Sequence, residues 1–124
     1  MREYAIGIDV GGTNIKVGLF DRSMNPVKHL QTLTDKELEA DQMMDHLAGQ
    51  VRQLLAETHL TPADIRGVGA AFPSFIDYQN GIVVETSNII SLNDQPVRDM
   101  LAERLDLPIY LDNGANAAAL AEHE

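Results

Sequence analysis

Asp9, Gly11, Gly12 and Thr13 carry the groups with the clearest chemistry in this sequence. They lie in IGIDVGGTNIKVGLF, residues 6–20, where two apolar runs meet at a turn. Glycine accepts positive φ and lets a ligand approach the backbone, so successive amides in such a turn can bind an anion. The Thr13 hydroxyl adds a donor, and Asp9 could hold Mg²⁺, directly or through water, that bridges to phosphate oxygens. The set predicts a site for the phosphates of a metal–nucleotide complex.

Two familiar phosphate-binding loops are excluded at this turn. GIDVGG does not match GxGxxG, because Asp9 stands at its third position and a strand pattern rather than a helix follows. The chain also lacks GK[ST], which ends a P-loop. On the local pattern alone, a structural hairpin that uses Asp9 as a turn-capping acceptor remains open as the alternative.

The turn must be positioned by strands on both sides of it. Alternating or continuous apolar residues with β-branched side chains predict three early strands, at residues 4–10, 14–21 and 27–33. A stripe at spacings of three and four then predicts an amphipathic helix, with Ala40, Met43, Met44, Leu47, Val51, Leu54 and Leu55 as its core face. Thr34 and Glu37 form a capping-box pattern, so we expect this helix to start near Asp35.

The rest of the chain predicts helical crossovers between strands. We expect a single short turn at Thr61-Pro62 and a helix with Asp94 as N-cap and Pro96 in its first turn. Further strands are expected at 65–72, 81–86 and 109–111, and a last helix at 116–122. This order indicates an α/β fold: a mixed five-stranded sheet with its first strand near the centre and helices on its faces.

Composition limits the function classes. The formal net charge is −10 and the nine Lys and Arg residues are scattered, so nucleic acid is not an expected partner. There is no cysteine, and the four histidines lack ligand spacing; we expect His46 and His59 to be surface residues. No apolar run reaches the length of a membrane span, and the expected location is the cytoplasm. The last helix stops abruptly, so we expect the chain to be part of a longer protein.

Four blocks give the sequence a family resemblance. IGIDVGGTNIKVGLFD resembles the first phosphate motif of the actin-like sugar-kinase superfamily, and IRGVGAAFPSFID, GIVVETSNI and LPIYLDNGANAAALAE are similar, in order and spacing, to blocks of the ROK (repressor, open reading frame, kinase) family. The resemblance implies a ribonuclease-H-like, actin-like ATPase lobe. It also implies ATP-dependent transfer of phosphate to a sugar hydroxyl in a cleft between two lobes, of which residues 1–124 form the N-terminal one.

The resemblance assigns roles to individual residues. Asp9, Gly11, Gly12 and Thr13 would face the nucleotide phosphates and Mg²⁺, with Asp9 reaching the metal through water. The implied sugar-binding residues are Asn88 and Asn113, which would bind hydroxyls, and Pro73 and Ser74, which would line the pocket. The family usually has glycine where Ser74 stands, a change that would narrow the pocket or alter the sugar preference.

The largest departure is at Gly114. The family pattern reads Asn-Asp-Ala-Asn, in which the aspartate is the general base, whereas this chain reads Asn113-Gly114-Ala115-Asn116. Asp112 is a weak substitute, because two residues along a strand displace a side chain by about 6.6 Å, so a polar strand end is the simpler interpretation. No catalytic residue is therefore assigned, and a sugar-sensing regulator or kinase-like binding protein stands as the alternative to a kinase.

The remaining expectations concern partners. The resemblance places the adenine pocket and a zinc-binding block in a second lobe, and no zinc site is expected here. The family's repressors carry a helix-turn-helix before the first phosphate motif, and this chain begins only a few residues before it, which favours the kinase branch. A lobe cut from its partner exposes apolar surface, so we expect self-association through the inter-lobe face.

Overall fold

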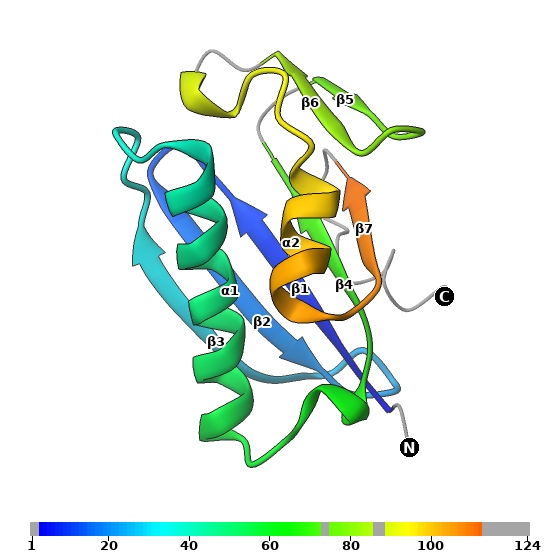
Figure 1. Ribbon diagram of the computed structural model, residues 1–124. Coiled ribbons are helices and arrows are strands. Elements are labelled where there is room, and N and C mark those ends of the chain that lie inside the picture. Colours follow the sequence, from blue (N-terminus) through cyan, green and yellow to red (C-terminus); the bar gives the residue numbers. More distant parts are fainter. Residues whose placement is uncertain (1–2, 73–74, 86–88, 113–124) are drawn as a thin grey trace.

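A computed structural model describes residues 3–72, 75–85 and 89–112 (Figure 1). Its main body is a five-stranded mixed sheet in the order β3-β2-β1-β4-β7, next to a two-stranded sheet of β5 and β6. The strands are β1 (Tyr4–Val10), β2 (Asn14–Phe20), β3 (Pro26–Leu33), β4 (Ile65–Ala71), β5 (Phe75–Asp77), β6 (Ile82–Glu85) and β7 (Ile109–Asp112). The helices are α1 (Ala40–Glu57) and α2 (Val97–Leu105), with short 3₁₀ turns η1 (Pro62–Asp64) and η2 (Ile90–Leu92).

The central position of β1 confirms the expected topology. β1 pairs antiparallel with β2, and β2 pairs antiparallel with β3, so residues 4–33 form a meander. β4 then pairs parallel with the other side of β1, and β7 pairs parallel with β4. Parallel neighbours need crossovers, which α1 and α2 supply. The carboxyl ends of β1, β4 and β7 consequently share one edge of the sheet.

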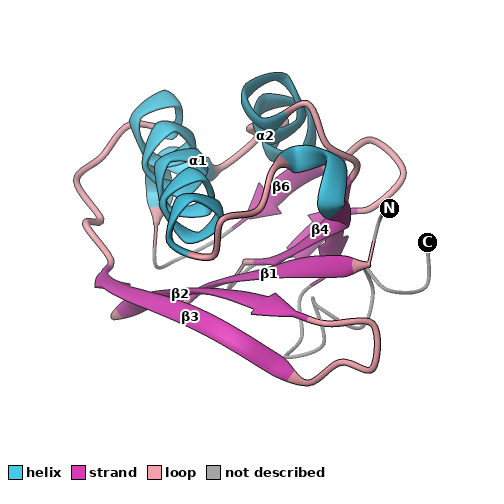
Figure 2. Cartoon of the chain, turned by 90° about the horizontal axis from the view of Figure 1, so that it is seen from below, coloured by secondary structure: helices cyan, strands magenta, loops and turns pink. Residues whose placement is uncertain are grey.

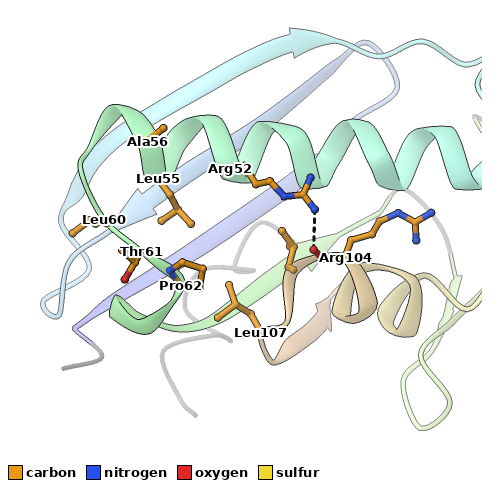
Figure 3. Close-up of a pocket in the computed structure, with 9 residues that line it drawn as sticks. Arg52, Leu55, Ala56, Leu60, Thr61, Pro62, Arg104 and Leu107 are labelled. Atoms are coloured by element: carbon orange, nitrogen blue, oxygen red, sulfur yellow. Dashed lines mark hydrogen bonds between the residues drawn. The ribbon is translucent and has the colours of Figure 1, made fainter.

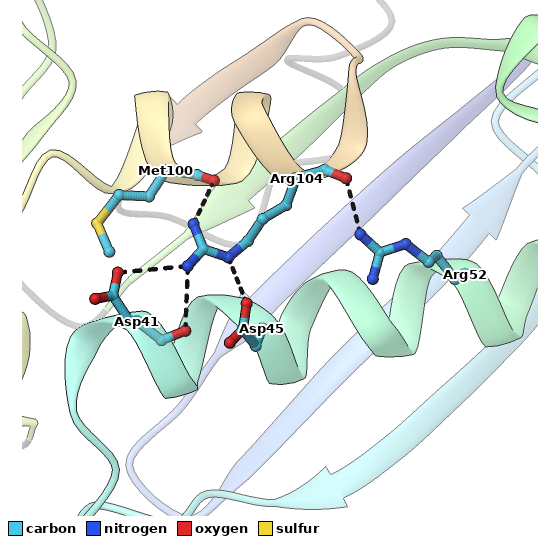
Figure 4. Close-up of polar contacts among 5 residues, drawn as sticks. All are labelled: Asp41, Asp45, Arg52, Met100 and Arg104. Atoms are coloured by element: carbon cyan, nitrogen blue, oxygen red, sulfur yellow. Dashed lines mark hydrogen bonds and ion pairs between the residues drawn. The ribbon is translucent and has the colours of Figure 1, made fainter.

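Both described helices cover the same face of the sheet (Figure 2). Alternate residues of β1 and β2 point to this face and pack with the helices; they are Ile6, Ile8, Val10, Ile15, Val17 and Leu19. The α1 stripe is buried as expected, and Met43 and Met44 have no exposed surface. The helices are also joined by polar contacts, in which Arg104 of α2 binds Asp41 and Asp45 of α1 (Figure 4).

The opposite face of the sheet is built of small residues. Gly7 of β1 pairs with Gly18 on one side and with Gly69 on the other. Glycine here makes room for rings: a Cβ on Gly18 would lie 3.0 Å from the ring of Phe20, and a Cβ on Gly67 would lie 2.9 Å from the ring of Tyr110. The small residues that suggested a buried central strand at 65–72 therefore serve close approach by aromatic rings as well as burial.

Several predicted boundaries are wrong for identifiable reasons. α1 starts at Ala40, not near Asp35, because Glu39 is the N-cap and its amide donates to the side chain of Gln42 (3.0 Å). The N-cap of α2 is Pro96, while Asp94 adopts a left-handed conformation (φ 63°). β5 and η2 were not predicted, since a three-residue segment gives too little periodicity. The short turn at Pro62 is confirmed, and the helix expected at 116–122 lies outside the described residues.

Candidate functional site

Residues 11–14 form the tight turn between β1 and β2, as the sequence predicts. The amide of Gly11 donates to the carbonyl of Asn14 (2.9 Å), which closes the turn. A Cβ on Gly11 would lie only 2.9 Å from that same carbonyl oxygen, so glycine is required here by close backbone approach. Positive φ, the reason expected from the sequence, is not used: among the described glycines only Gly81 has it.

The groups that remain available on the turn are donors. Among the described residues, the amides of Gly12 and Thr13 and the Thr13 hydroxyl have no hydrogen-bond partner. Three of the turn's four carbonyls are occupied: Thr34 binds those of Gly11 and Thr13, and the Gly11 amide binds that of Asn14. Unpartnered amides beside occupied carbonyls give the turn a local excess of positive partial charge. This arrangement suits an anion, although one of the expected amides, that of Gly11, is used inside the turn.

Asp9 lies one strand residue before the turn, on the face opposite the helices. Its side chain is exposed and makes no hydrogen bond or ion pair with another described residue. Lys16 stands directly opposite it on β2, also exposed and without a described partner. Directly opposite residues of an antiparallel pair have Cα atoms about 4.5–5.5 Å apart. A carboxylate and an ammonium group therefore flank the donor-rich turn.

The Asp9 carboxylate meets the ligand requirements of Mg²⁺. Magnesium in proteins keeps several waters and takes one or two carboxylates together with substrate phosphates. An unpaired, exposed carboxylate beside an anion site fits that requirement. No three His, Cys, Asp or Glu side chains gather into a metal site anywhere in the described ranges. Asp9 is accordingly the residue in this part of the chain that could contact such an ion.

The predicted sugar-binding residues cannot be placed in the same way. Pro73, Ser74, Asn88, Asn113 and Gly114 lie outside the described residues. Of Asp112, only its backbone place at the end of β7 is described. The hairpin of β5 and β6 is described, and it lies at the end of the molecule where β1, β4 and β7 finish (Figure 1).

Arg98 of α2 holds that hairpin in place. Its guanidinium donates to the carbonyls of Tyr78 (3.0 Å) and Gln79 (3.2 Å), and its amide donates to Gly81 (3.2 Å). Gly81 needs positive φ (71°), and a Cβ there would lie 2.6 Å from Arg98 Nε. In the same turn, the Asp77 carboxylate accepts hydrogen bonds from the Asn80 side chain and backbone, which lower the pKa of Asp77 below its ordinary value.

Residues 5–124 match the ROK family over nearly the whole chain. The chain belongs to the ROK family.

Named relatives of this ROK chain are sugar kinases. It is 32% identical over 119 residues to a glucokinase of Halalkalibacterium halodurans, covering 96% of this chain and 36% of that protein. It is 31% identical over 117 residues to an N-acetyl-D-glucosamine kinase of Yersinia pestis, covering 94% of this chain and 43% of that protein. The chain thus spans less than half the length of these relatives.

Solved structures share the fold. A ROK hexokinase from Thermus thermophilus superposes with a TM-score of 0.80 at 32% identity, covering 97% of this chain and 38% of that one. A ROK family glucokinase from Streptomyces griseus, in complex with glucose and AMPPNP, gives a TM-score of 0.77 at 28% identity, covering 94% and 35%. The ribonuclease-H-like, actin-like ATPase architecture expected from the sequence is confirmed.

A separate pocket lies at the other edge of the sheet in this ROK chain (Figure 3). It has a volume of about 330 Å³ and is lined by the ends of α1 and α2 and the loops that follow them. Arg52 reaches across it to donate to the carbonyl of Arg104 (2.8 Å). Because these loops lead into the amino ends of β4 and β7, the pocket is at the edge opposite the turn of residues 11–14 and is not part of that site.

Sequence reasoning missed three residues near the candidate site. Lys16 could have been found from the two-residue period of strands, which puts it on the same face as Asp9 once the turn is known. The sequence pattern assigned Thr34 to a helix cap, whereas its hydroxyl donates to the carbonyl of Gly11 in the turn. Arg98 carries no sequence signal, because its role depends on how α2 packs against the hairpin. His46, expected on the surface, is half-buried and its Nε2 lies 3.1 Å from the hydroxyl of Thr32.

Proposed function

We propose that this lobe supplies the phosphate-binding side of an ATP-dependent sugar kinase and part of the sugar pocket. The observation that supports this most directly is the turn of residues 11–14, in which the Gly12 and Thr13 donors have no described partner while the carbonyls of Gly11 and Thr13 are bound by Thr34. The named relatives phosphorylate glucose or N-acetyl-D-glucosamine according to their names, which supports a hexose as the acceptor class.

Each residue at the turn has a role in this proposal. The amides of Gly12 and Thr13 and the Thr13 hydroxyl bind the terminal phosphate oxygens, with Gly11 allowing the tight approach of the two strands. Asp9 holds Mg²⁺, the proposed cofactor of the complete protein, through water; when bound, that ion would neutralise phosphate charge. Lys16 adds a cation next to the phosphates, which matters in a chain of net charge −10, because long-range repulsion must be overcome locally.

The sugar side remains a proposal from the family pattern. Pro73 and Ser74 line the pocket, and Asn88 and Asn113 hydrogen-bond hydroxyl groups of the sugar. The hairpin of β5 and β6, fixed by Arg98, sits between these segments along the chain. Positioning and charge neutralisation dominate phosphoryl transfer, so these contacts support catalysis without a covalent step.

Gly114 favours a second candidate function. A hydrogen side chain cannot accept the proton of the sugar hydroxyl, and general-base catalysis typically contributes about 10²–10⁴-fold. A protein that binds nucleotide and sugar but turns them over slowly could serve as a sugar-sensing regulator or kinase-like binding protein. The two candidates share the binding site and differ only in turnover.

One experiment separates these outcomes in the full-length protein that carries this lobe. Calorimetry with Mg–AMPPNP and a hexose panel measures binding, and coupled turnover of ATP measures catalysis, for the parent sequence and for Gly114→Asp. A kinase with a missing base binds both ligands and gains turnover of about 10²-fold or more in the variant. A regulator binds the sugar without that gain. Absence of nucleotide binding in the parent protein contradicts the proposal.

Two further proposals concern the surroundings of the chain. We propose self-association of the isolated lobe, since Leu33 and Ile90 expose 76% and 71% of their surface; sedimentation velocity over a concentration series that gives only monomer would contradict it.

None of the helices in the described ranges is long and apolar enough to cross a bilayer. A cytoplasmic location is the corresponding proposal, and cell fractionation tests it.

A further inference from the structure

We propose that Thr34 is a positioning residue for the nucleotide site, which it serves by holding the turn of residues 11–14 in its donor-exposing form. The inference rests on the proposed function, because it concerns binding at that same turn. Thr34 lies immediately after β3, far from the turn in sequence but in direct contact with it. It makes two hydrogen bonds to the turn, one from its side chain and one from its backbone.

The two bonds act on different carbonyls. The hydroxyl Oγ1 of Thr34 donates to the carbonyl of Gly11 at 2.9 Å, and this contact is partly buried. The amide of Thr34 donates to the carbonyl of Thr13 at 2.8 Å, which continues the pairing of β2 with β3 beyond Asn14 and Leu33. One residue therefore binds both ends of the segment that would cradle the phosphates.

Occupying the carbonyls matters for an anion. A turn whose carbonyls and amides both face solvent presents mixed partial charge, whereas a turn whose carbonyls are bound elsewhere presents mainly amides. The Gly11 amide is already used by Asn14, so the donors of Gly12 and Thr13 carry the binding. The Gly12 amide lies in the same peptide plane as the Gly11 carbonyl, so the bond from the Thr34 hydroxyl restrains the direction of that donor. The bond from the Thr34 amide to the Thr13 carbonyl restrains the next peptide, between Thr13 and Asn14, where the turn ends.

An alternative explanation for Thr34 does not fit the structure. The sequence pattern with Glu37 suggested a helix cap, but α1 begins at Ala40 and uses Glu39 as its N-cap. In the loop between them, the Glu37 amide donates to Asp35 (3.0 Å) and not to Thr34. The Thr34 hydroxyl is thus engaged by the turn and not by the helix.

The chain offers a matched control for removing this hydroxyl. Thr58, at the end of α1, also donates its partly buried hydroxyl to a backbone carbonyl, that of Leu54, at 2.9 Å. It lies after α1, where the chain leads toward the amino end of β4, and so away from the turn. The Thr58 hydroxyl also lies 3.2 Å from the carbonyl of Leu55. Thr34→Val and Thr58→Val each remove one such hydroxyl with its bonds and keep a β-branched side chain. Thr34→Ser keeps the hydroxyl and is the rescue variant.

The experiment uses the full-length protein and two readouts, the dissociation constant for Mg–AMPPNP and the hydrogen exchange of the Gly11 and Thr34 amides, which are hydrogen-bonded at the turn. We expect Thr34→Val to weaken nucleotide binding by about three- to tenfold, the worth of one hydrogen bond, and to speed exchange at the turn. Sugar affinity should be unchanged. Thr58→Val should leave both readouts as in the parent protein, and Thr34→Ser should restore most of the affinity.

The outcomes separate this inference from the proposed function. If Thr34→Val binds nucleotide as the parent does, or if Thr58→Val weakens binding equally, the positioning role is wrong while the kinase proposal stands. If the parent protein does not bind nucleotide, the proposed function fails, and unchanged turn exchange in Thr34→Val then also removes the structural part of the inference.

Discussion

Replacing Gly11 by alanine tests whether the turn is closed as the structure shows. The added Cβ would lie 2.9 Å from the carbonyl oxygen of Asn14, a distance that real Cβ atoms essentially never show. That oxygen is backbone and already accepts the Gly11 amide at 2.9 Å, so it cannot move away without breaking the bond. Loss of one hydrogen bond and local strain together predict a cost of about 1–3 kcal/mol in the free energy of unfolding.

Gly49→Ala is the matched control for this substitution. Gly49 lies inside α1, and a Cβ there meets nothing within 4 Å. Alanine in a helix interior is favoured over glycine by about 0.5–1 kcal/mol, so this variant should be stabilised. The same chemical change thus has opposite signs at the two sites.

Urea denaturation of the 124-residue chain, followed by circular dichroism, measures both effects. With a slope of about 1–3 kcal/mol/M for a small protein, the midpoint of Gly11→Ala should fall by roughly 1 M, and that of Gly49→Ala should rise slightly. Equal midpoints for Gly11→Ala and the parent chain would show that Gly11 and Asn14 are not in close contact. The donor geometry argued for the turn would then lose its basis.

Three further predictions concern contacts away from the turn. Arg98→Met should speed hydrogen exchange in the β5–β6 hairpin and raise the KM for sugar in the full-length protein while the KM for ATP is unchanged. The pKa of Asp77 is lowered chiefly by the hydrogen bond from the Asn80 side chain, so the ionised carboxylate stabilises the hairpin fully above the ordinary pKa of 3.8, and this stabilisation is lost as the pH falls through the lower folded pKa. Hydrogen exchange of the hairpin amides should therefore speed up below pH 3.8 in the parent protein, and this dependence on pH should be smaller in Asp77→Asn. Asp45→Ala removes an exposed partner of Arg104 (2.7 Å) and should lower the free energy of unfolding by less than about 1 kcal/mol, measured by urea titration. Arg104→Met also loses the bond to the carbonyl of Met100 and should lower it by about 1–2 kcal/mol.

Strong periodicity made most of the fold predictable. Apolar residues at regular spacing form a face that must be buried. Such patterns predicted the strands flanking the turn, the stripe of α1 and the central place of β1. Helix starts were harder, because several polar residues compete to cap one helix. Thr34, Glu39 and Asp94 all have suitable side chains, and the surrounding contacts decide which of them caps a helix.

The candidate site was predictable only where the chemistry is local. Asp9, Gly11, Gly12 and Thr13 lie together in sequence, so their grouping did not depend on tertiary structure. The contacts that shape the site do depend on it, since Thr34 reaches the turn through the pairing of β2 with β3. The reason for Gly11 also changed, from conformational freedom to close approach, which is a property of the paired backbone and not of the residue alone.

The place of the turn within the meander has a consequence for how this lobe forms during synthesis. Every group that shapes the turn of residues 11–14 lies between Asp9 and Thr34, inside a β-meander made by neighbouring segments. The parallel pairing of β1 with β4 joins Tyr4 to Ile65 and must wait for α1 to emerge. Because nearby segments pair faster than distant ones, we expect this turn to be assembled on the ribosome before the segments proposed to bind the sugar have been synthesised.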